Sequence, residues 1–200
     1  MKIEEMISAV QKKLGVQVDG RAGPETWGAI YAHVVKPKIG SHLPAIEPVD
    51  QRSEKIIATL LQEVQPFARS LVQKTAQNGI KIKIISGHRT YAEQDELYAQ
   101  GRTKPGSKVT NARGGYSNHN FGIAFDVGVF EGTAYLPESV KYKVVGVLGM
   151  DLGLEWGGNW KTIVDQPHFQ LRPQWAADLS EKDMLAELRA RVQEGNSIYA

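Results

Sequence analysis

The chain has 200 residues, a formal net charge of +2 and no cysteine. Its length suits one medium domain with or without a small accessory module, and the weak charge gives no reason to expect a nucleic-acid partner. Without cysteine the chain has no disulfides, thiolate zinc sites or cysteine nucleophiles, so a metal site must use histidine and carboxylate ligands.

Residues 1–36 predict a small helical module. Apolar side chains at helical spacing predict one helix over residues 3–14. An Asp-Gly turn signal follows at 19–20, and Gly-Pro at 23–24 opens a second helix with Trp27 on its apolar face. Acids near the N-terminus do not fit a signal peptide, and no apolar run approaches the roughly 20 residues that span a membrane. We therefore expect no membrane insertion.

Residues 37–50 predict a linker, because this stretch is rich in proline and has no apolar periodicity. A second domain then spans residues 51–200. Its first apolar pattern predicts a long helix that begins at the N-cap Ser53, is kinked at Pro66 and ends at Gly79.

The middle of the second domain predicts a strand, a helix and a long loop. Residues 80–85 alternate like a strand, and Thr90 with Glu93 forms a capping box for a helix through Gln100. Residues 101–118 are rich in Gly, Lys, Arg, Asn and Ser and predict a loop of the length that is usually functional or disordered.

The remainder of the domain predicts strands at 123–130 and 168–171, a helix over 138–150, and a C-terminal helix capped by Ser180. We therefore expect an α+β fold: a small antiparallel sheet with flanking helices, preceded by the small helical module.

Two polar residues flank an apolar strand in the segment GGYSNHNFGIAFDVGVF, residues 114–130. His119 and Asp126 are costly to bury without partners. In an unbroken strand they would point to opposite faces, but Gly122 permits a bend that aims both at one point. His168 heads a later strand, and Asp165 lies three residues before it.

Two histidines and one carboxylate, with a fourth position open, form the arrangement of a catalytic zinc site, in which Asp165 would act as general base. The alternative is a hydrogen-bonded loop histidine and an aspartate that caps a turn or pairs with an arginine. Spacing alone does not decide between the zinc site and these structural roles, since the three residues are spread over about fifty positions.

Three motifs in order resemble those of metallopeptidases that cut bacterial cell-wall peptides. Residues 117–126, SNHNFGIAFD, match the pattern S-x-H-x-x-G-x-A-x-D, and residues 165–170, DQPHFQ, match a second motif. Residues 86–98, SGHRTYAEQDELY, resemble the S-G-x-R segment upstream. The chain thus resembles the zinc D-alanyl-D-alanine carboxypeptidases and phage L-alanyl-D-glutamate endopeptidases.

This resemblance implies a role for each matching residue. The implied site consists of zinc ligands His119, Asp126 and His168, a base at Asp165, an oxyanion-stabilising and substrate-binding Arg89, and substrate contacts from Ser117 and Gln94. Arg89 is always charged and follows a strand, which suits this role, although a surface salt bridge is the alternative. For Gln94 the alternatives are support of Arg89 and a solvated glutamine on a helix face.

The N-terminal module has its own resemblance. Residues 19–27 match the D-G-x-x-G-P-x-T-W segment of the peptidoglycan-binding helical module, but the unit is shorter than the usual three-helix version. It is therefore interpreted either as a wall-binding module or as a helical cap on the catalytic domain.

The resemblance implies a zinc peptidase, and we expect a monomeric phage endolysin that hydrolyses the L-alanyl-D-glutamate bond of bacterial peptidoglycan. Without a signal peptide, it would stay in the host cytoplasm until released to the cell wall. One alternative is a D-alanyl-D-alanine carboxypeptidase, for which the basic loop at 101–113 would capture a free carboxylate. Another is a wall-binding protein without catalysis, which would not need Asp165.

Overall fold

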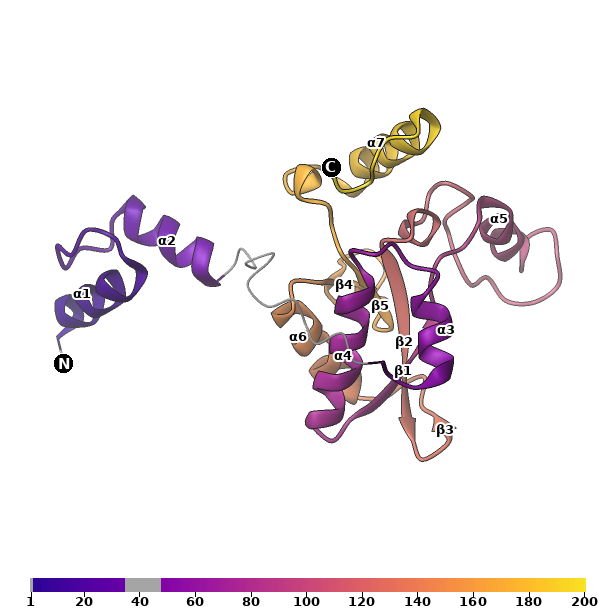
Figure 1. Ribbon diagram of the computed structural model, residues 1–200, viewed down its shortest axis with the longest axis horizontal. Coiled ribbons are helices and arrows are strands. Elements are labelled where there is room, and N and C mark those ends of the chain that lie inside the picture. The colour runs from indigo at the N-terminus through magenta and orange to yellow at the C-terminus, as the bar shows by residue number, and fades with distance from the viewer. Residues whose placement is uncertain (1, 35–47) are drawn as a thin grey trace. The chain divides into compact units, whose positions relative to one another are not determined.

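A computed structural model describes residues 2–34 and 48–200, and the chain divides into two compact units, Met1–His42 and Leu43–Ala200 (Figure 1). Most of the predicted linker lies outside the described residues. None of the helices within the described ranges has the length and apolarity needed to span a bilayer.

The first unit contains two helices, α1 (Ile3–Leu14) and α2 (Pro24–Val34). They are joined through the buried side chain of Gln11 on α1. Its amide nitrogen donates to Asp19 Oδ1 at 2.7 Å and to Thr26 Oγ1 at 2.9 Å, and its oxygen accepts from the Gly20 N–H at 2.9 Å. The residues of the predicted turn are therefore held by one polar side chain, which compensates for the small apolar surface of the module.

The second unit begins with two helices, α3 (Gln51–Ile57) and α4 (Gln65–Gln77), so the prediction of one long kinked helix is wrong. Pro66 stands in the first turn of α4, where its missing N–H leaves no hydrogen bond unmade, and the helix restarts there. The N-cap of α3 is Asp50, whose side chain accepts from the Ser53 N–H. Ser53 is instead buried, and its hydroxyl accepts from the Ile84 N–H at 3.0 Å.

A five-stranded sheet forms the centre of the second unit, in the order β1-β2-β5-β4 with β3 paired to β2. All its pairings are antiparallel. The strands are β1 (Lys81–Ser86), β2 (Ala124–Glu131), β3 (Ala134–Tyr135), β4 (Glu155–Trp156) and β5 (His168–Gln170). The predicted α+β class with a small antiparallel sheet is confirmed.

Helices and short 3-10 turns connect the strands and follow the last of them. In chain order they are α5 (Tyr91–Ala99), η1 (Asn118–Phe121), α6 (Lys141–Asp151), η2 (Gly157–Asn159), η3 (Gln174–Ala176) and α7 (Glu181–Glu194). Two sequence signals are confirmed here: Thr90 and Glu93 form the capping box of α5, and Ser180 caps α7.

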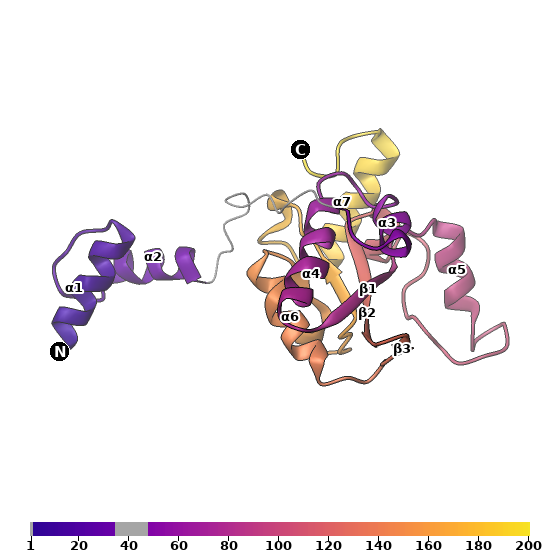
Figure 2. The same cartoon turned by 60° about the horizontal axis from the view of Figure 1, so that its bottom comes forward.

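The main core lies between one face of the sheet and α3, α4 and α6. Figures 1 and 2 both show α3 and α4 against β1 and β2. Their side chains Ile57 and Leu71 share a buried cluster with Phe125 and Val127 of β2. A second cluster joins η1 to α7 through Phe121 and five other buried apolar residues. The opposite face of β2 and β5 therefore remains available for polar groups.

Two glycines let α6 approach the sheet closely. A Cβ at Gly149 would lie 2.4 Å from the Phe169 ring, and one at Gly146 would lie 2.4 Å from the Trp156 ring. Because Phe169 is fully buried, its ring has no free space to move into.

We expect Gly149→Ala to lower the free energy of unfolding by about 1–3 kcal/mol, the usual range for overpacking a core. Urea denaturation measures the change, and Val147→Ala on the exposed side of α6 is the control. Equal stability of the two variants would mean that α6 shifts to accept the methyl group.

Candidate metal centre and active site

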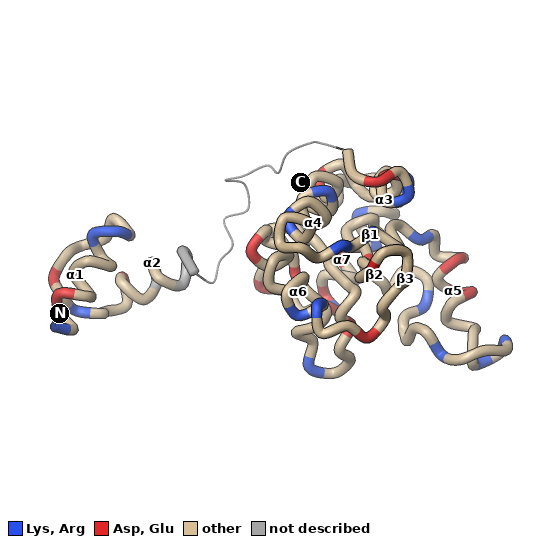
Figure 3. The backbone as a smooth tube through the Cα atoms, turned by 90° about the horizontal axis from the view of Figure 1, so that it is seen from below, with Lys and Arg blue, Asp and Glu red and all other residues tan. Residues whose placement is uncertain are grey.

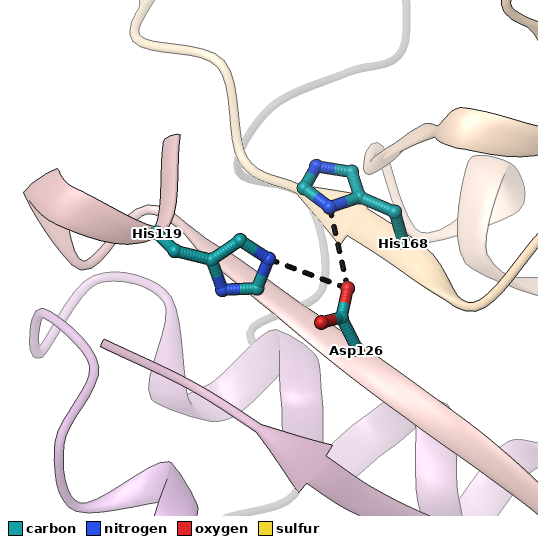
Figure 4. Close-up of side chains that lie close together, drawn as sticks. All are labelled: His119, Asp126 and His168. Carbon is teal, nitrogen blue, oxygen red and sulfur yellow. Dashed lines mark ion pairs between the residues drawn. The ribbon is translucent and has the colours of Figure 1, made fainter. Parts of the chain in front are cut away.

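Two of the predicted ligands face each other across neighbouring strands. Asp126 on β2 and His168 on β5 are directly paired in the antiparallel register. Paired residues project from the same face of a sheet, and here it is the face opposite the buried Phe125 and Val127. The pairing brings the Asp126 Oδ1 atom to 3.3 Å from His168 Nδ1 (Figure 4).

The third predicted ligand reaches the same point from η1. His119 lies in this 3-10 turn, which ends at Gly122 in a left-handed conformation with φ of +67°. The predicted bend at Gly122 is therefore present, and the chain turns there before β2 begins. His119 Nε2 lies 3.3 Å from Asp126 Oδ1, and Figure 4 shows both rings directed at that carboxylate.

The three side chains have the donor set and spacing of a metal site. One ligand atom from each lies within 4.8 Å of the others. His119 Nε2 and Asp126 Oδ1 are also buried without a hydrogen-bond partner, which is unfavourable for polar atoms. Two imidazoles and one carboxylate suit zinc, and a cation between them would satisfy both atoms, so the residues fit this group.

The other ring nitrogens hold the two histidines in position. His119 Nδ1 lies 2.8 Å from the Gly87 carbonyl oxygen, which can only accept, so Nδ1 carries the proton. His168 Nε2 lies 2.9 Å from Gln170 Oε1. Each contact directs the opposite nitrogen toward Asp126, which is the arrangement found in metal-binding histidines of other proteins.

The charges of the cluster also suit a cation. Burial would raise the pKa of Asp126, but the adjacent His119 and His168 outweigh it and hold that pKa below its usual range. Burial lowers the pKa of His119. Burial would also lower the pKa of His168, but the Asp126 carboxylate outweighs burial and raises that pKa. Asp126 and His119 therefore have the protonation states that a metal requires of its ligands, and His168 would release a proton when a metal binds.

Arg89 lies at the edge of this cluster. Its backbone N–H donates to the His119 carbonyl at 3.1 Å, and its own carbonyl accepts from Asn120 Nδ2 at 2.9 Å. One guanidinium nitrogen lies 3.9 Å from Asp126 Oδ2, while Nε is buried without a partner. Asn120, which the sequence analysis did not single out, thus joins η1 to the arginine segment.

Asp165 lies in a tight turn immediately before β5. Its N–H donates to the Gly157 carbonyl at 3.0 Å, and its carbonyl accepts from the His168 N–H at 3.2 Å. Burial, followed by the negative charge of Asp126, raises the pKa of the Asp165 carboxyl group. A carboxyl group of this kind is suited to accepting and returning a proton.

The two predicted substrate contacts are placed differently. Ser117 is partly exposed and immediately precedes η1. Gln94 is 0% exposed, and its amide nitrogen donates to Thr110 Oγ1 at 3.2 Å and to the Ala112 carbonyl at 2.9 Å. Gln94 therefore supports the loop after α5, because a fully buried side chain presents no surface to a substrate.

Comparisons with known proteins place these residues in context. A family model described as D-alanyl-D-alanine carboxypeptidase (VanY) matches residues 58–145, which include His119 and Asp126 but end before His168. The peptidoglycan L-alanyl-D-glutamate endopeptidase CwlK of Bacillus subtilis is 39% identical over 120 residues, which cover 55% of this chain and 72% of that protein. The L-alanyl-D-glutamate peptidase of Listeria phage A118 is 31% identical over 124 residues, covering 60% and 40% respectively.

Two solved structures are similar in outline. The L-Ala D-Glu endopeptidase ChiX of Serratia marcescens matches with a TM-score of 0.48 and 26% identity, over 65% of this chain and 95% of the other. The D,D-pentapeptidase VanY from a VanB-type resistance cassette, solved with Zn(II), matches with a TM-score of 0.45 and 16% identity, over 66% and 83%.

Proposed function

We propose that this chain is a zinc-dependent endopeptidase that cleaves the L-alanyl-D-glutamate bond of stem peptides. The chain belongs to the D-alanyl-D-alanine carboxypeptidase family of peptidoglycan hydrolases. The observation that carries the zinc proposal is the cluster of buried His119 and His168 with half-buried Asp126, in which His119 Nε2 and Asp126 Oδ1 have no hydrogen-bond partner. The relative at 39% identity, named for that bond, supports the choice of substrate.

In this mechanism His119, Asp126 and His168 would hold the zinc, which would supply Lewis-acid polarisation of the scissile carbonyl and of the attacking water. Asp165 accepts a proton from the water and returns it to the leaving amine. Arg89 donates to the carbonyl oxygen as negative charge develops there, and its partial burial strengthens this interaction.

Mass spectrometry of the products from defined muropeptides tests the bond that is cut. The proposal expects fragments that separate L-alanine from D-glutamate, with the terminal D-alanine still attached. Release of free D-alanine from a pentapeptide would instead identify the chain as a carboxypeptidase.

The contacts of two of the four cations in the basic loop favour the endopeptidase over the carboxypeptidase. Lys and Arg gather on the loop that follows α5 (Figure 3). Arg102, however, already donates to the carbonyls of Tyr98 at 2.7 Å and Thr110 at 3.0 Å, and Lys104 pairs with Glu96. These two cations hold the loop together, so they are poorly placed to capture the carboxylate of a free peptide end.

We also propose that the first unit binds the cell wall, as part of a phage endolysin. It contains an apolar groove of about 230 Å³, lined by seven residues that include Met6, Val10 and Trp27. Trp27 is 59% exposed, and an aromatic ring on such a surface is well suited to packing against a sugar or peptide. The similarity to a phage peptidase supports the endolysin role.

Trp27→Ala should weaken binding to intact sacculi about tenfold, the effect expected from losing a central aromatic contact. Sedimentation with sacculi measures the binding, and hydrolysis of a soluble muropeptide should stay at the wild-type rate. Val18→Ala, which changes an exposed residue outside the groove, is the matched control. A loss of activity on both substrates, with a lower melting temperature, would favour the helical cap.

A further inference from the structure

We propose that Gln170 is a positioning residue that keeps the proton of His168 on Nε2 and leaves Nδ1 free to bind the metal. It does so through a chain of hydrogen bonds that begins at Arg172 and Glu155. The inference rests on the zinc site of the proposed function and assigns a role to residues outside its ligands and base.

At the Arg172 end of this series of hydrogen bonds, the residue types decide which group donates and which accepts. Arg172 Nε donates to Glu155 Oε1 at 2.5 Å, and Glu155 Oε2 accepts from Gln170 Nε2 at 2.7 Å. A guanidinium can only donate and an ionised carboxylate can only accept. Glu155 therefore selects the amide nitrogen of Gln170, and the orientation of that amide follows from chemistry.

With its amide oriented in this way, Gln170 presents its oxygen as a hydrogen-bond acceptor to His168. Gln170 Oε1 lies 2.9 Å from His168 Nε2 and 2.6 Å from Asn118 Nδ2. Since the oxygen can only accept, His168 Nε2 must carry the proton. The unprotonated Nδ1 is then directed at Asp126 Oδ1, 3.3 Å away.

The backbone and the burial of these groups keep the chain of bonds in place. Glu155 on β4 and Gln170 on β5 are directly paired in the antiparallel register, so their side chains share one face. Gln170 is 0% exposed and His168 is 5% exposed, which leaves little access for water to replace the bond between them. Arg172 is also tied to Glu181 of α7 at 2.8 Å.

Without the Gln170 oxygen, the neutral His168 ring could carry its proton on Nδ1 instead of Nε2. A proton on His168 Nδ1 would be donated to the Asp126 carboxylate, which is the stronger acceptor. That tautomer blocks the nitrogen that faces the cluster. Gln170 therefore works against the local attraction of Asp126, and its loss should weaken metal binding as well as activity.

The experiment uses full-length protein with ¹⁵N-labelled histidine. NMR spectra of the metal-free form, at alkaline pH where the ring is neutral, report which nitrogen of His168 carries the proton. Competition with a chromophoric chelator gives the zinc dissociation constant of each variant. The variants are Gln170→Leu, Glu155→Gln, and the double exchange of Gln170→Glu with Glu155→Gln. The control is Gln65→Leu, which removes a partly buried glutamine that donates a hydrogen bond to the Leu60 carbonyl.

We expect the proton on Nε2 in the wild type and on Nδ1 in Gln170→Leu, with zinc affinity about 10–100-fold weaker, the usual effect of losing a partner of a metal-binding histidine. In the double exchange the bond between positions 155 and 170 is reversed, but each bond still joins a donor to an acceptor and an oxygen still faces His168 Nε2, so the Nε2 proton and most of the affinity should be restored. Gln65→Leu should match the wild type.

A bare Nε2 in the wild type, or an unchanged proton position and affinity in Gln170→Leu, would overturn the proposal. If Gln170→Leu does not fold, Glu155→Gln decides, because an unaltered tautomer there would show that Glu155 does not orient the amide. If the wild type binds no zinc, the proposed function fails, while the tautomers of the metal-free proteins still test the role of Gln170.

Discussion

His119→Ala should lose its zinc and, with it, all measurable hydrolysis of muropeptides. Removing one of the three proposed ligands leaves Asp126 and His168 unable to complete a catalytic zinc site. The fold should persist, because the main core is formed by α3, α4, α6 and the sheet, and His119 lies outside that cluster. Elemental analysis of the purified protein measures the zinc, and circular dichroism checks the fold.

His88→Ala is the matched control, since this histidine is exposed and lies in the neighbouring segment of chain. It should keep one zinc per chain. Chelation of the wild type should reproduce the loss of activity seen in His119→Ala. Added zinc should restore activity to the chelated wild type and should not restore it to His119→Ala. Full activity in a chelated sample that contains no metal would refute the zinc mechanism.

The local elements of the fold were largely predictable because their signals are short. The capping box of Thr90 and Glu93 and the cap at Ser180 need only neighbouring residues, and both are present in the structure. The bend at Gly122 was predictable for the same reason, since glycine readily adopts the left-handed conformation found there.

The break between α3 and α4 was not predictable from apolar spacing, because both helices present their apolar residues to one core. Ser53 has the residue type of an N-cap, yet its hydroxyl bonds to β1 from inside α3. Tertiary contacts of this kind override a local preference and are not visible in a pattern of residue types.

In the site, too, some features follow from local sequence signals and others depend on tertiary contacts. The motif around His119 and Asp126 identifies candidate ligands, but their meeting with His168 depends on the register between β2 and β5, which joins segments far apart in sequence. Gln94 was interpreted from its motif as a substrate contact and is buried under a loop. Gln170 shares the face of His168 by simple alternation, but its bond to Glu155 requires the pairing with β4.

Asp165→Asn should retain zinc and lose about two to four orders of magnitude in turnover, the usual contribution of a general acid-base group. Asparagine has nearly the same shape, and the backbone contacts of residue 165 with Gly157 and His168 remain. The neutral amide, however, cannot accept a proton from water. Steady-state rates on a soluble muropeptide and the zinc content of the same sample are measured together, with Asp151→Asn, an exposed aspartate on α6, as control.

The two measurements separate the roles that this position can have. A loss of rate with zinc retained identifies Asp165 as the base, because the ligands still hold the metal. If zinc falls in proportion to the rate, the Asp165 carboxylate contributes to holding the metal and its role as a base is not shown. Near-normal turnover would refute both roles, and the proton would then have to pass through another group of the site.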